Sequence, residues 1–378
     1  MTISFLLSCT PVKNKDIEII PIDLDEISTN CTMIKKIDLI PLETSDKGLI
    51  DDIRKIMYIP DLKKFVIKDK NNVISIFTED GFFCLNSQDL MGDAPYQYNS
   101  IVDFSYNEYT ETIDILTING EIKSYDCSFN FKGYKKISID KGYIPSKFMA
   151  IDSSTYVISP TINQNENIFF LDVENQNVKM SHYKELIANV TMDVNSFYSI
   201  NNKYYFIPRG INYYFYEIDK IKKEISPIIY LDFGREIINI DKLPGNIKFG
   251  EYDSKHPNVE NYFKEMEKRD NYLVNSNYYL PIIKFFNDEY VYIHAIKKRK
   301  AYNFIYNRIN KEYFTQTEDT PFPMRFCLGI YDDILYTYIN PYDIEKYCNT
   351  DLITPESKER IAKVQEEDNI IIVKYHLK

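Results

Sequence analysis

Side chains that carry most enzyme chemistry are few and scattered in this chain. The four histidines form no i, i+4 pair and share no segment: His182, His256, His294 and His376. The later cysteines form no C-x-x-C pair, so zinc and thioredoxin-like sites are not indicated: Cys31, Cys84, Cys127, Cys327 and Cys348. No nucleophile elbow, phosphate-binding loop, dinucleotide fingerprint or H-E-x-x-H motif occurs. We therefore name no catalytic residue, metal ligand or cofactor, and an enzyme is not the favoured interpretation.

Local charge runs are explained by turns and helix ends. Paired carboxylates occur at Asp51-Asp52, Asp332-Asp333 and Glu366-Glu367-Asp368. The densest basic run, residues 297–300, predicts a hairpin turn between two aromatic segments, with a phosphate or anionic-glycan contact as the alternative. One disulfide, such as Cys327 to Cys348, is an alternative in an oxidising envelope, although free buried cysteines are the favoured interpretation.

Composition favours a globular β protein without a nucleic-acid partner. Of 378 residues, 44% are hydrophobic and 27% are charged, which is close to the globular average. The 33 Tyr and 23 Phe, beside no Trp and only 11 Gly, suit pleated, half-buried surfaces. Because 56 acidic residues outnumber 45 basic ones, the net charge is -11, and the basic stripe of a nucleic-acid binder is not indicated.

An internal repeat predicts the architecture. Aromatic-rich strands that end in polar turns recur with anchors 45 to 48 residues apart, at Phe77, Tyr125, Leu171 and Tyr216. Tyr306 continues the series after an insertion. A period of about 40–50 residues with four short strands per unit is typical of propeller blades.

The repeat predicts an all-β fold, a six-bladed β-propeller of four-stranded antiparallel blades over residues 36–378. Residues 235–276 are expected as a helical insertion and residues 355–366 as a helix within the last blade. The sixth unit lacks an outer strand, and the apolar strand at 36–42 is the expected donor that closes the ring. Residues 10–35 are expected to be an N-terminal linker.

The first nine residues predict a bacterial lipid anchor. The apolar run ends in Leu6-Leu7-Ser8-Cys9, which resembles the lipobox of lipoprotein signal peptides. We interpret residues 1–9 as a residual signal segment, trimmed or begun at a late start codon, because a basic n-region is missing. Cys9 would be the lipidated residue, and an ordinary frayed N-terminus is the alternative. The predicted location is the cell envelope, anchored to the outer membrane on its periplasmic or surface face.

Nearly the whole chain also resembles the six-bladed β-propeller lipoproteins of Gram-negative gut-type bacteria, which are NHL-like and have no established activity. The similar elements, in order, are residues 37–44, the turn at 79–82, the loop at 92–98, the stretch at 230–234 and the ending at 366–378. In the family that loop reads closer to G-Q-G-P-G-E-Y, so Asp93, Ala94 and Tyr96 depart from it. The resemblance implies the propeller fold and an envelope location.

Candidate ligand-binding residues follow from the expected propeller, because such proteins bind ligands at one mouth of the channel. An arginine there could hold a carboxylate or phosphate, and a tyrosine could stack on a sugar or peptide. The alternative is that the arginines form structural ion pairs and the tyrosines pack between blades. The candidates are Gly92, Asp93, Pro95, Tyr96, Tyr98, Arg209, Tyr213 and Arg325.

Three function classes are open at this point. The favoured one is a non-catalytic, envelope-anchored binding or scaffold propeller that presents a loop face to a protein, peptide or glycan. It is expected to be monomeric and to contact the membrane only through its lipid anchor. The second is a lyase or hydrolase like those on NHL-type propellers, with a channel metal. The third is an assembly role in which the insertion docks on a membrane complex through Tyr262, Phe263 and Met266; alternatively, that stripe covers the propeller's own side.

Overall fold

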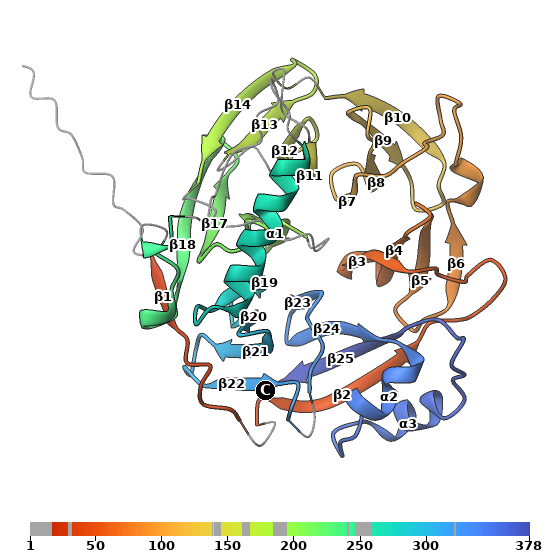
Figure 1. Ribbon diagram of the computed structural model, residues 1–378. Coiled ribbons are helices and arrows are strands. Elements are labelled where there is room, and N and C mark those ends of the chain that lie inside the picture. The colour runs from red at the N-terminus through yellow and green to blue at the C-terminus, as the bar shows by residue number, and fades with distance from the viewer. Residues whose placement is uncertain are drawn as a thin grey trace, which may run out of the picture.

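Six sheets stand around a central channel, each with four antiparallel strands, and one of them carries an additional fifth strand (Figure 1). The computed structural model describes residues 17–28, 32–137, 139, 145–160, 167–183, 195–239, 242–245, 259–320 and 323–378. The six-bladed propeller expected from the repeat is therefore confirmed.

Each blade runs from an inner strand at the channel to an outer strand at the rim. The inner strands are β3 (Ile53–Ile59), β7 (Asp103–Asn107), β11 (Pro145–Ala150), β15 (Phe197–Ile200), β19 (Leu280–Phe286) and β23 (Gly329–Tyr331). The second strands are β4 (Lys64–Asp69), β8 (Thr112–Leu116), β12 (Thr155–Pro160), β16 (Lys203–Phe206), β20 (Tyr290–Lys297) and β24 (Ile334–Ile339). The third strands are β5 (Ile74–Thr78), β9 (Glu121–Tyr125), β13 (Asn167–Asp172), β17 (Tyr214–Asp219), β21 (Lys300–Asn307) and β25 (Ile371–Leu377). The outer strands are β6 (Phe83–Asn86), β10 (Phe131–Lys136), β14 (Asn177–His182), β18 (Glu224–Asp232), β22 (Tyr313–Thr317) and β2 (Ile34–Pro41).

The repeat anchors lie in the third strands of five blades, and all of them are buried: Phe77, Tyr125, Leu171, Tyr216 and Tyr306. Each pair of adjacent blades buries an apolar cluster between its sheets. Between the first two blades, for example, Val66 and Ile76 belong to one cluster with Phe104 and Ile113. Full burial of one such side chain contributes about 1.5–3 kcal/mol, so the faces between blades supply the apolar core that holds the ring together.

The ring closes through an N-terminal strand, as the sequence predicts. Strand β2 pairs antiparallel with β25, from Ile34 opposite Leu377 to Pro41 opposite Ile371. This pairing supplies the missing outer strand of the sixth blade. Between β24 and β25 lie α2 (Ile344–Tyr347) and α3 (Pro355–Ile361). Helix α3 ends before residue 366, and Asp368 then accepts a hydrogen bond from the Gln365 amide (2.7 Å) where the chain turns toward β25.

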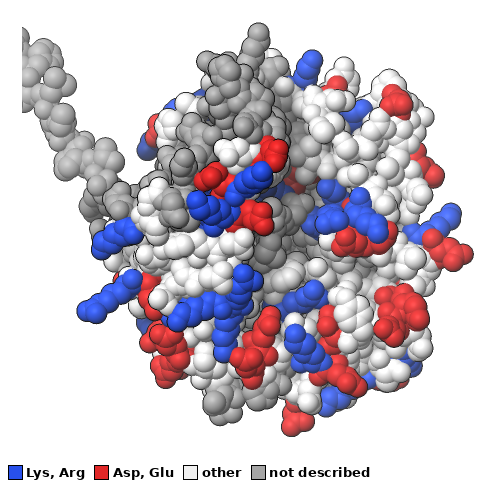
Figure 2. All heavy atoms as spheres, in the orientation of Figure 1, with Lys and Arg blue, Asp and Glu red and all other residues white. Residues whose placement is uncertain are grey.

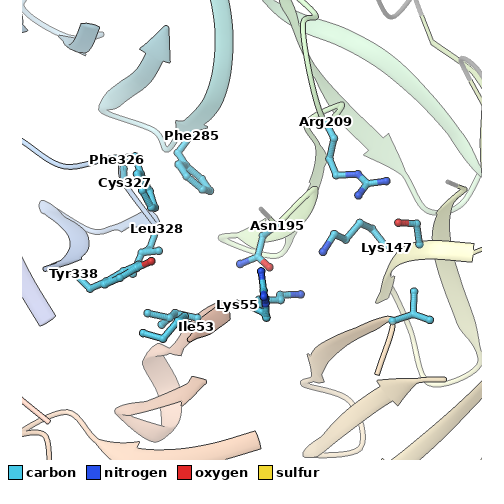
Figure 3. Close-up of a pocket in the computed structure, with 14 residues that line it drawn as sticks. Ile53, Lys55, Lys147, Asn195, Arg209, Phe285, Phe326, Cys327, Leu328 and Tyr338 are labelled. Atoms are coloured by element: carbon cyan, nitrogen blue, oxygen red, sulfur yellow. The ribbon is translucent and has the colours of Figure 1, made fainter. Parts of the chain in front are cut away.

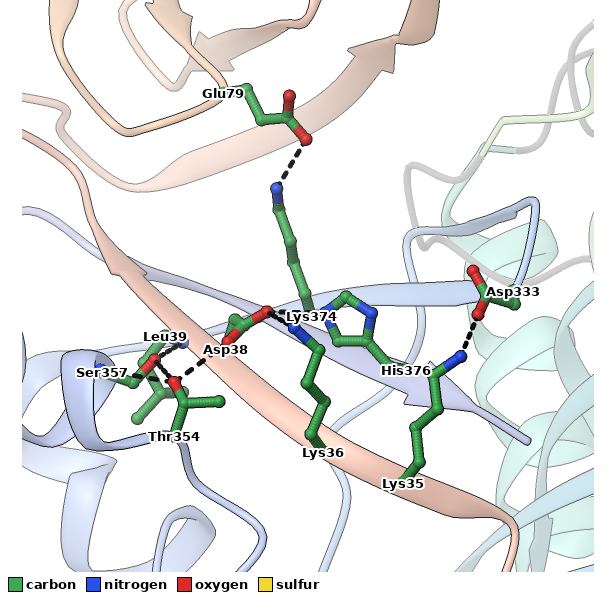
Figure 4. A network of polar contacts seen from close by, with 10 residues as sticks. All are labelled: Lys35, Lys36, Asp38, Leu39, Glu79, Asp333, Thr354, Ser357, Lys374 and His376. Atoms are coloured by element: carbon green, nitrogen blue, oxygen red, sulfur yellow. Dashed lines mark hydrogen bonds and ion pairs between the residues drawn. The ribbon is translucent and has the colours of Figure 1, made fainter.

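A polar network fastens this closing strand to its neighbours (Figure 4). Asp38 on β2 accepts a hydrogen bond from the Thr354 hydroxyl (3.0 Å), and its second oxygen contacts His376 Nε2 on β25 (2.7 Å). The amide of Leu39 donates to the Ser357 hydroxyl in α3 (2.8 Å). The closure is therefore held by backbone pairing on one edge of β2 and by helix side chains on the other.

The segment expected to be a linker contains one more strand, which the sequence did not indicate. Strand β1 (Glu18–Pro21) pairs parallel with β18 and gives the fourth blade a fifth strand. Glu18 also forms an ion pair with Arg308, and the Ser28 amide donates to the Thr315 carbonyl (2.9 Å). The N-terminal segment thus joins the rims of the fourth and fifth blades before it enters the sixth.

The insertion between the fourth and fifth blades holds helix α1 (Val259–Asn275), which crosses one face of the ring (Figure 1). Leu273 near its end is buried in the core, whereas the Phe263 side chain is 60% exposed. The basic run at 297–300 is the predicted hairpin turn, between β20 and β21. In it, the Arg299 amide donates to the Val274 carbonyl (2.8 Å), so the turn docks on the end of α1.

Cys84, Cys127, Cys327 and Cys348 are free. Within the described residues, no helix is long and apolar enough to cross a membrane.

The closing strand generates a stability prediction. Leu39 is fully buried in the cluster between the last two blades. We expect Leu39→Ala to lower the free energy of unfolding by about 2–5 kcal/mol, because it leaves a cavity where the ring closes. Chemical denaturation followed by circular dichroism measures the change. The control is Leu49→Ala at a side chain that is 59% exposed, with an expected effect within about 0.5 kcal/mol. Equal effects of the two substitutions would contradict this account of the closure.

Candidate functional site

Two cavities occupy opposite ends of the channel. The first has a volume of about 470 Å³ and is lined at the starts of inner strands, for example by Ile53–Ile56 and Ser146-Lys147. The second, of about 450 Å³, is lined toward their ends, for example by Met57–Asp61 and Phe148–Ala150. Lys55, Lys147 and Asn195 border both cavities, so they lie where the two ends meet.

The two ends differ in charge. The first cavity is lined by four basic side chains and, among the described residues, by no acidic one; the four are Arg54, Lys55, Lys147 and Arg209 (Figure 3). Asp61, Asp103 and Glu108 line the second cavity. On the outer face in the view of Figure 2, the described basic and acidic side chains are interspersed. Among the described residues, the first cavity is thus basic in a protein whose net charge is -11.

Two buried lysines share one aspartate at the point where the cavities meet. Asp103 Oδ1 lies 2.6 Å from Lys55 Nζ and 3.2 Å from Lys147 Nζ. The three side chains are at most 5% exposed. Burial raises the pKa of the Asp103 carboxyl, but the charges of Lys147 and Lys55 outweigh burial and hold that pKa below its usual value. The carboxylate stays ionised, and among the described residues two ammonium groups share this one negative charge.

Arg209 reaches the cavity from the loop between β16 and β17. A third buried lysine, Lys284 on β19, donates to the carbonyls of Gly210 (2.9 Å) and Asn212 (2.8 Å) in this loop. Gly210 has a positive φ of 87°, which glycine adopts without strain. Lys284 therefore connects the inner strand of the fifth blade to the loop that presents Arg209.

Burial lowers the pKa of the Lys284 amine to about 7, because a low-dielectric site disfavours the charged form. Its two carbonyl acceptors are satisfied by either the charged or the neutral amine, since both carry N–H donors. Lys284 can therefore hold the loop on both sides of neutral pH.

The opposite wall of the first cavity is apolar. Ile53, Phe285, Phe326 and Leu328 come from the first, fifth and sixth blades, and Tyr338 lies beside them (Figure 3). One basic wall and one apolar wall can hold a group that is charged on one side only.

Of the residues predicted from the sequence, Arg209 lines this cavity. Arg325 lies behind the wall of the cavity. Its guanidinium carbon is 4.9 Å from the centre of the Tyr338 ring, and its Nη1 is 3.5 Å from Asp343 Oδ2. Tyr213 is buried, and its hydroxyl donates to the Tyr279 carbonyl (3.1 Å) and accepts from the Ile238 amide (3.1 Å). This tyrosine packs inside the blades, which was the alternative to ligand stacking.

The predicted loop at 92–98 lies between the first and second blades and is fastened to them. Tyr98 is buried, and its hydroxyl contacts the Ser87 hydroxyl (2.5 Å). Lys123 Nζ donates to the carbonyls of Pro95 (3.1 Å) and Gln97 (2.5 Å). Gly92 has a φ of +151°, a backbone conformation that residues with a side chain rarely adopt, so glycine suits this position.

The exposed residues of that loop lie at the surface. Asp93 accepts a hydrogen bond from the Asn99 side chain, and Tyr96 is 49% exposed. A role of these two residues in ligand binding stays a prediction.

The sequence reasoning missed Lys55, Lys147 and Lys284. Each stands inside an inner strand and is followed by an apolar residue, as in Lys55-Ile56, Lys147-Phe148 and Lys284-Phe285. A lysine within the first strand of a repeat unit was the available signal, because that strand faces the channel. Among the described residues, no group of three or more His, Cys, Asp and Glu side chains could hold a metal ion.

The comparisons with known proteins concern the fold and the family. Among solved structures, a protein from Bacteroides fragilis NCTC 9343 that is inferred to be exported has a TM-score of 0.70 at 14% identity, over 96% of this chain and 100% of its own. U3-55K has a TM-score of 0.41 at 10% identity, over 80% of this chain and 78% of its own. Luciferin-regenerating enzyme has a TM-score of 0.40 at 10% identity, over 88% of this chain and 94% of its own.

The Bacteroides structure shares the fold, and nothing is drawn from the two lower scores. No curated protein matches the chain by sequence. A family model described as "Domain of unknown function (DUF4934)" matches residues 18–376, from β1 to the last residues of β25.

Lys284 generates a prediction on pH dependence. Its pKa is lowered from 10.5 to about 7 on folding, so between these values the unfolded chain binds more protons than the native protein. The free energy of unfolding should therefore rise with pH from about 7 to 10.5, with a slope of at most ~1.4 kcal/mol per pH unit from this group.

Urea denaturation of the wild type and of Lys284→Met at several pH values isolates the effect, because other titrating groups cancel in the difference. A difference that does not change with pH would show that the native Lys284 amine titrates as it does in water.

Proposed function

The chain belongs to the DUF4934 family, a domain of unknown function, and from that premise we propose that it is a non-catalytic binding protein that holds an anionic group of its partner in the channel. The observation that carries the proposal is the first cavity, where four basic side chains line a site without a described acidic one. Its volume of about 470 Å³ lies within the usual range of ligand pockets, roughly 300–1,000 Å³.

Electrostatics and geometry support an anion at this position. Low-dielectric walls focus the field of a charged cleft, so basic groups in the channel attract anions despite the net negative charge of the protein. A guanidinium such as that of Arg209 has the geometry to bind a carboxylate or phosphate through two parallel hydrogen bonds, while Lys147 and Lys55 add positive charge beneath it. Protein, peptide and glycan partners can all present such a group.

The lyase or hydrolase alternative requires a cation in the channel. Four basic side chains line the first cavity, which disfavours a metal ion there, and the described acidic residues of the second cavity include Asp103, which two lysines already pair. The residues therefore favour binding of an anion over metal-assisted chemistry.

We also propose that the protein is exported and attached to the envelope through a lipid on Cys9, which lies outside the described residues. Two observations support this location: the Leu6-Leu7-Ser8-Cys9 sequence and the fold shared with a Bacteroides protein inferred to be exported. Export and lipidation would place the channel in contact with envelope or extracellular partners.

Anion binding is tested by calorimetric titration with inorganic phosphate at low salt. We expect binding that weakens with ionic strength, and at least a tenfold weaker affinity in Arg209→Met and in Lys147→Met, because each loses a charge-assisted hydrogen bond of about 1.5–3 kcal/mol. Lys222→Met is the control, since this side chain is 69% exposed on the rim of the same blade as Arg209. Equal phosphate affinity in all four proteins would contradict the channel as the anion site.

Lipid attachment is tested by labelling cells that express the protein from its native gene with radioactive palmitate. The label should be present on the wild type and on the control Cys31→Ala, and absent from Cys9→Ala. An unlabelled wild-type protein would overturn the anchoring proposal.

A further inference from the structure

The first cavity has two chemically different walls, and their arrangement restricts the ligand beyond its charge. The cationic groups Lys55, Lys147 and Arg209 come from the first, third and fourth blades. Across the cavity stand Phe285 and Phe326, from the fifth and sixth blades (Figure 3). A ligand that fills both sides therefore carries its charge next to an apolar group.

We propose that the ligand is a carboxylate carried directly by an apolar group, as at the C-terminus of a peptide that ends in an apolar residue. This inference rests on the proposed function and names the class of anion. The carboxylate binds Arg209 and the ammonium groups of Lys55 and Lys147, and the apolar group packs on Phe285, Phe326 and Leu328.

The depth of the two lysines below the mouth of the channel favours a ligand whose charge lies at its end. Lys147 and Lys55 are only 2% and 5% exposed, so a charge that reaches them must enter end-on through the mouth of the channel. A chain end meets this condition, because its carboxylate leads and the rest of the peptide trails out of the cavity. The first cavity is also small, at about 470 Å³, so it takes the end of a chain rather than an extended segment.

The apolar wall disfavours a sugar. Phe285, Phe326, Leu328 and Ile53 offer no hydrogen-bonding side chain, and the Cys327 thiol beside them already donates to the Gly329 carbonyl (3.1 Å), so the polar group of this wall is the Tyr338 hydroxyl at its side. A sugar hydroxyl buried there without a partner costs about 1–3 kcal/mol. An apolar side chain instead gains about 0.8 kcal/mol for each CH₂ group that it buries.

The test compares four probes by calorimetry with the full chain: acetyl-Ala-Ala-Phe with a free carboxylate, its C-terminal amide, acetyl-Ala-Ala-Ser with a free carboxylate, and glucuronate. We expect the free Phe peptide to bind at least tenfold more tightly than each of the other three. N-acetylphenylalanine is a fifth probe that separates two sources of the same chemistry. A similar affinity for it supports a free small acid, and a weaker one supports a peptide end.

A pair of variants locates the apolar contact. Phe326→Ser should weaken binding of the Phe peptide at least tenfold and leave phosphate binding unchanged, because it alters the apolar wall only. The control Phe82→Ser changes a side chain that is 63% exposed on a turn of the first blade, and both affinities should stay as in the wild type.

Glucuronate binding as tight as that of the Phe peptide, or equal affinities for the peptide and its amide, would overturn this inference while anion binding at the channel stands. The inference about the apolar group expects phosphate binding to be retained in Phe326→Ser and in Phe82→Ser. Absence of phosphate binding in the wild type would instead refute the proposed function.

Discussion

A buried aspartate shared by two lysines is the interaction on which the channel depends. Lys55, Asp103 and Lys147 belong to the first, second and third blades, so their contacts join three inner strands at the axis of the ring. Removing one partner of a buried pair leaves an uncompensated charge, which costs about 3–5 kcal/mol. Among the described residues, the same grouping places two lysines against one aspartate at the base of the first cavity. One arrangement therefore serves both the packing of the axis and the attraction of an anion.

This charged centre is possible because the rest of the ring is fastened by apolar faces and by the closing strand. Strand β2 completes the sixth blade, and β1 adds a fifth strand to the fourth, so the N-terminal segment stabilises two separate parts of the rim. A closed ring fixes the inner strands relative to one another. Lys284, which holds the carbonyls of Gly210 and Asn212, then fastens the loop that presents Arg209 to the cavity.

The fold was predictable from the sequence because blades are local, repeated units. Phe77 and Tyr125 mark equivalent strands, and the missing outer strand of the sixth blade identified β2. Strand β1 was not predictable, since its four residues carry no pattern and pair through the backbone with a strand distant in sequence. Arg209 was found because it follows a strand near the channel. Lys55 and Lys147 were missed, because only the closed ring decides which residues of an inner strand face its axis.

The central claim is that the channel holds an anion between Arg209, Lys147 and Lys55. A crystal structure of the protein with selenate, collected at the selenium edge, tests it most directly, because the anomalous signal locates the anion without reference to the protein density. The account predicts the strongest peak in the first cavity, within hydrogen-bond distance of Lys147 Nζ and the Arg209 guanidinium. Selenate found only on the outer surface, with the channel empty at the same concentration, would contradict it.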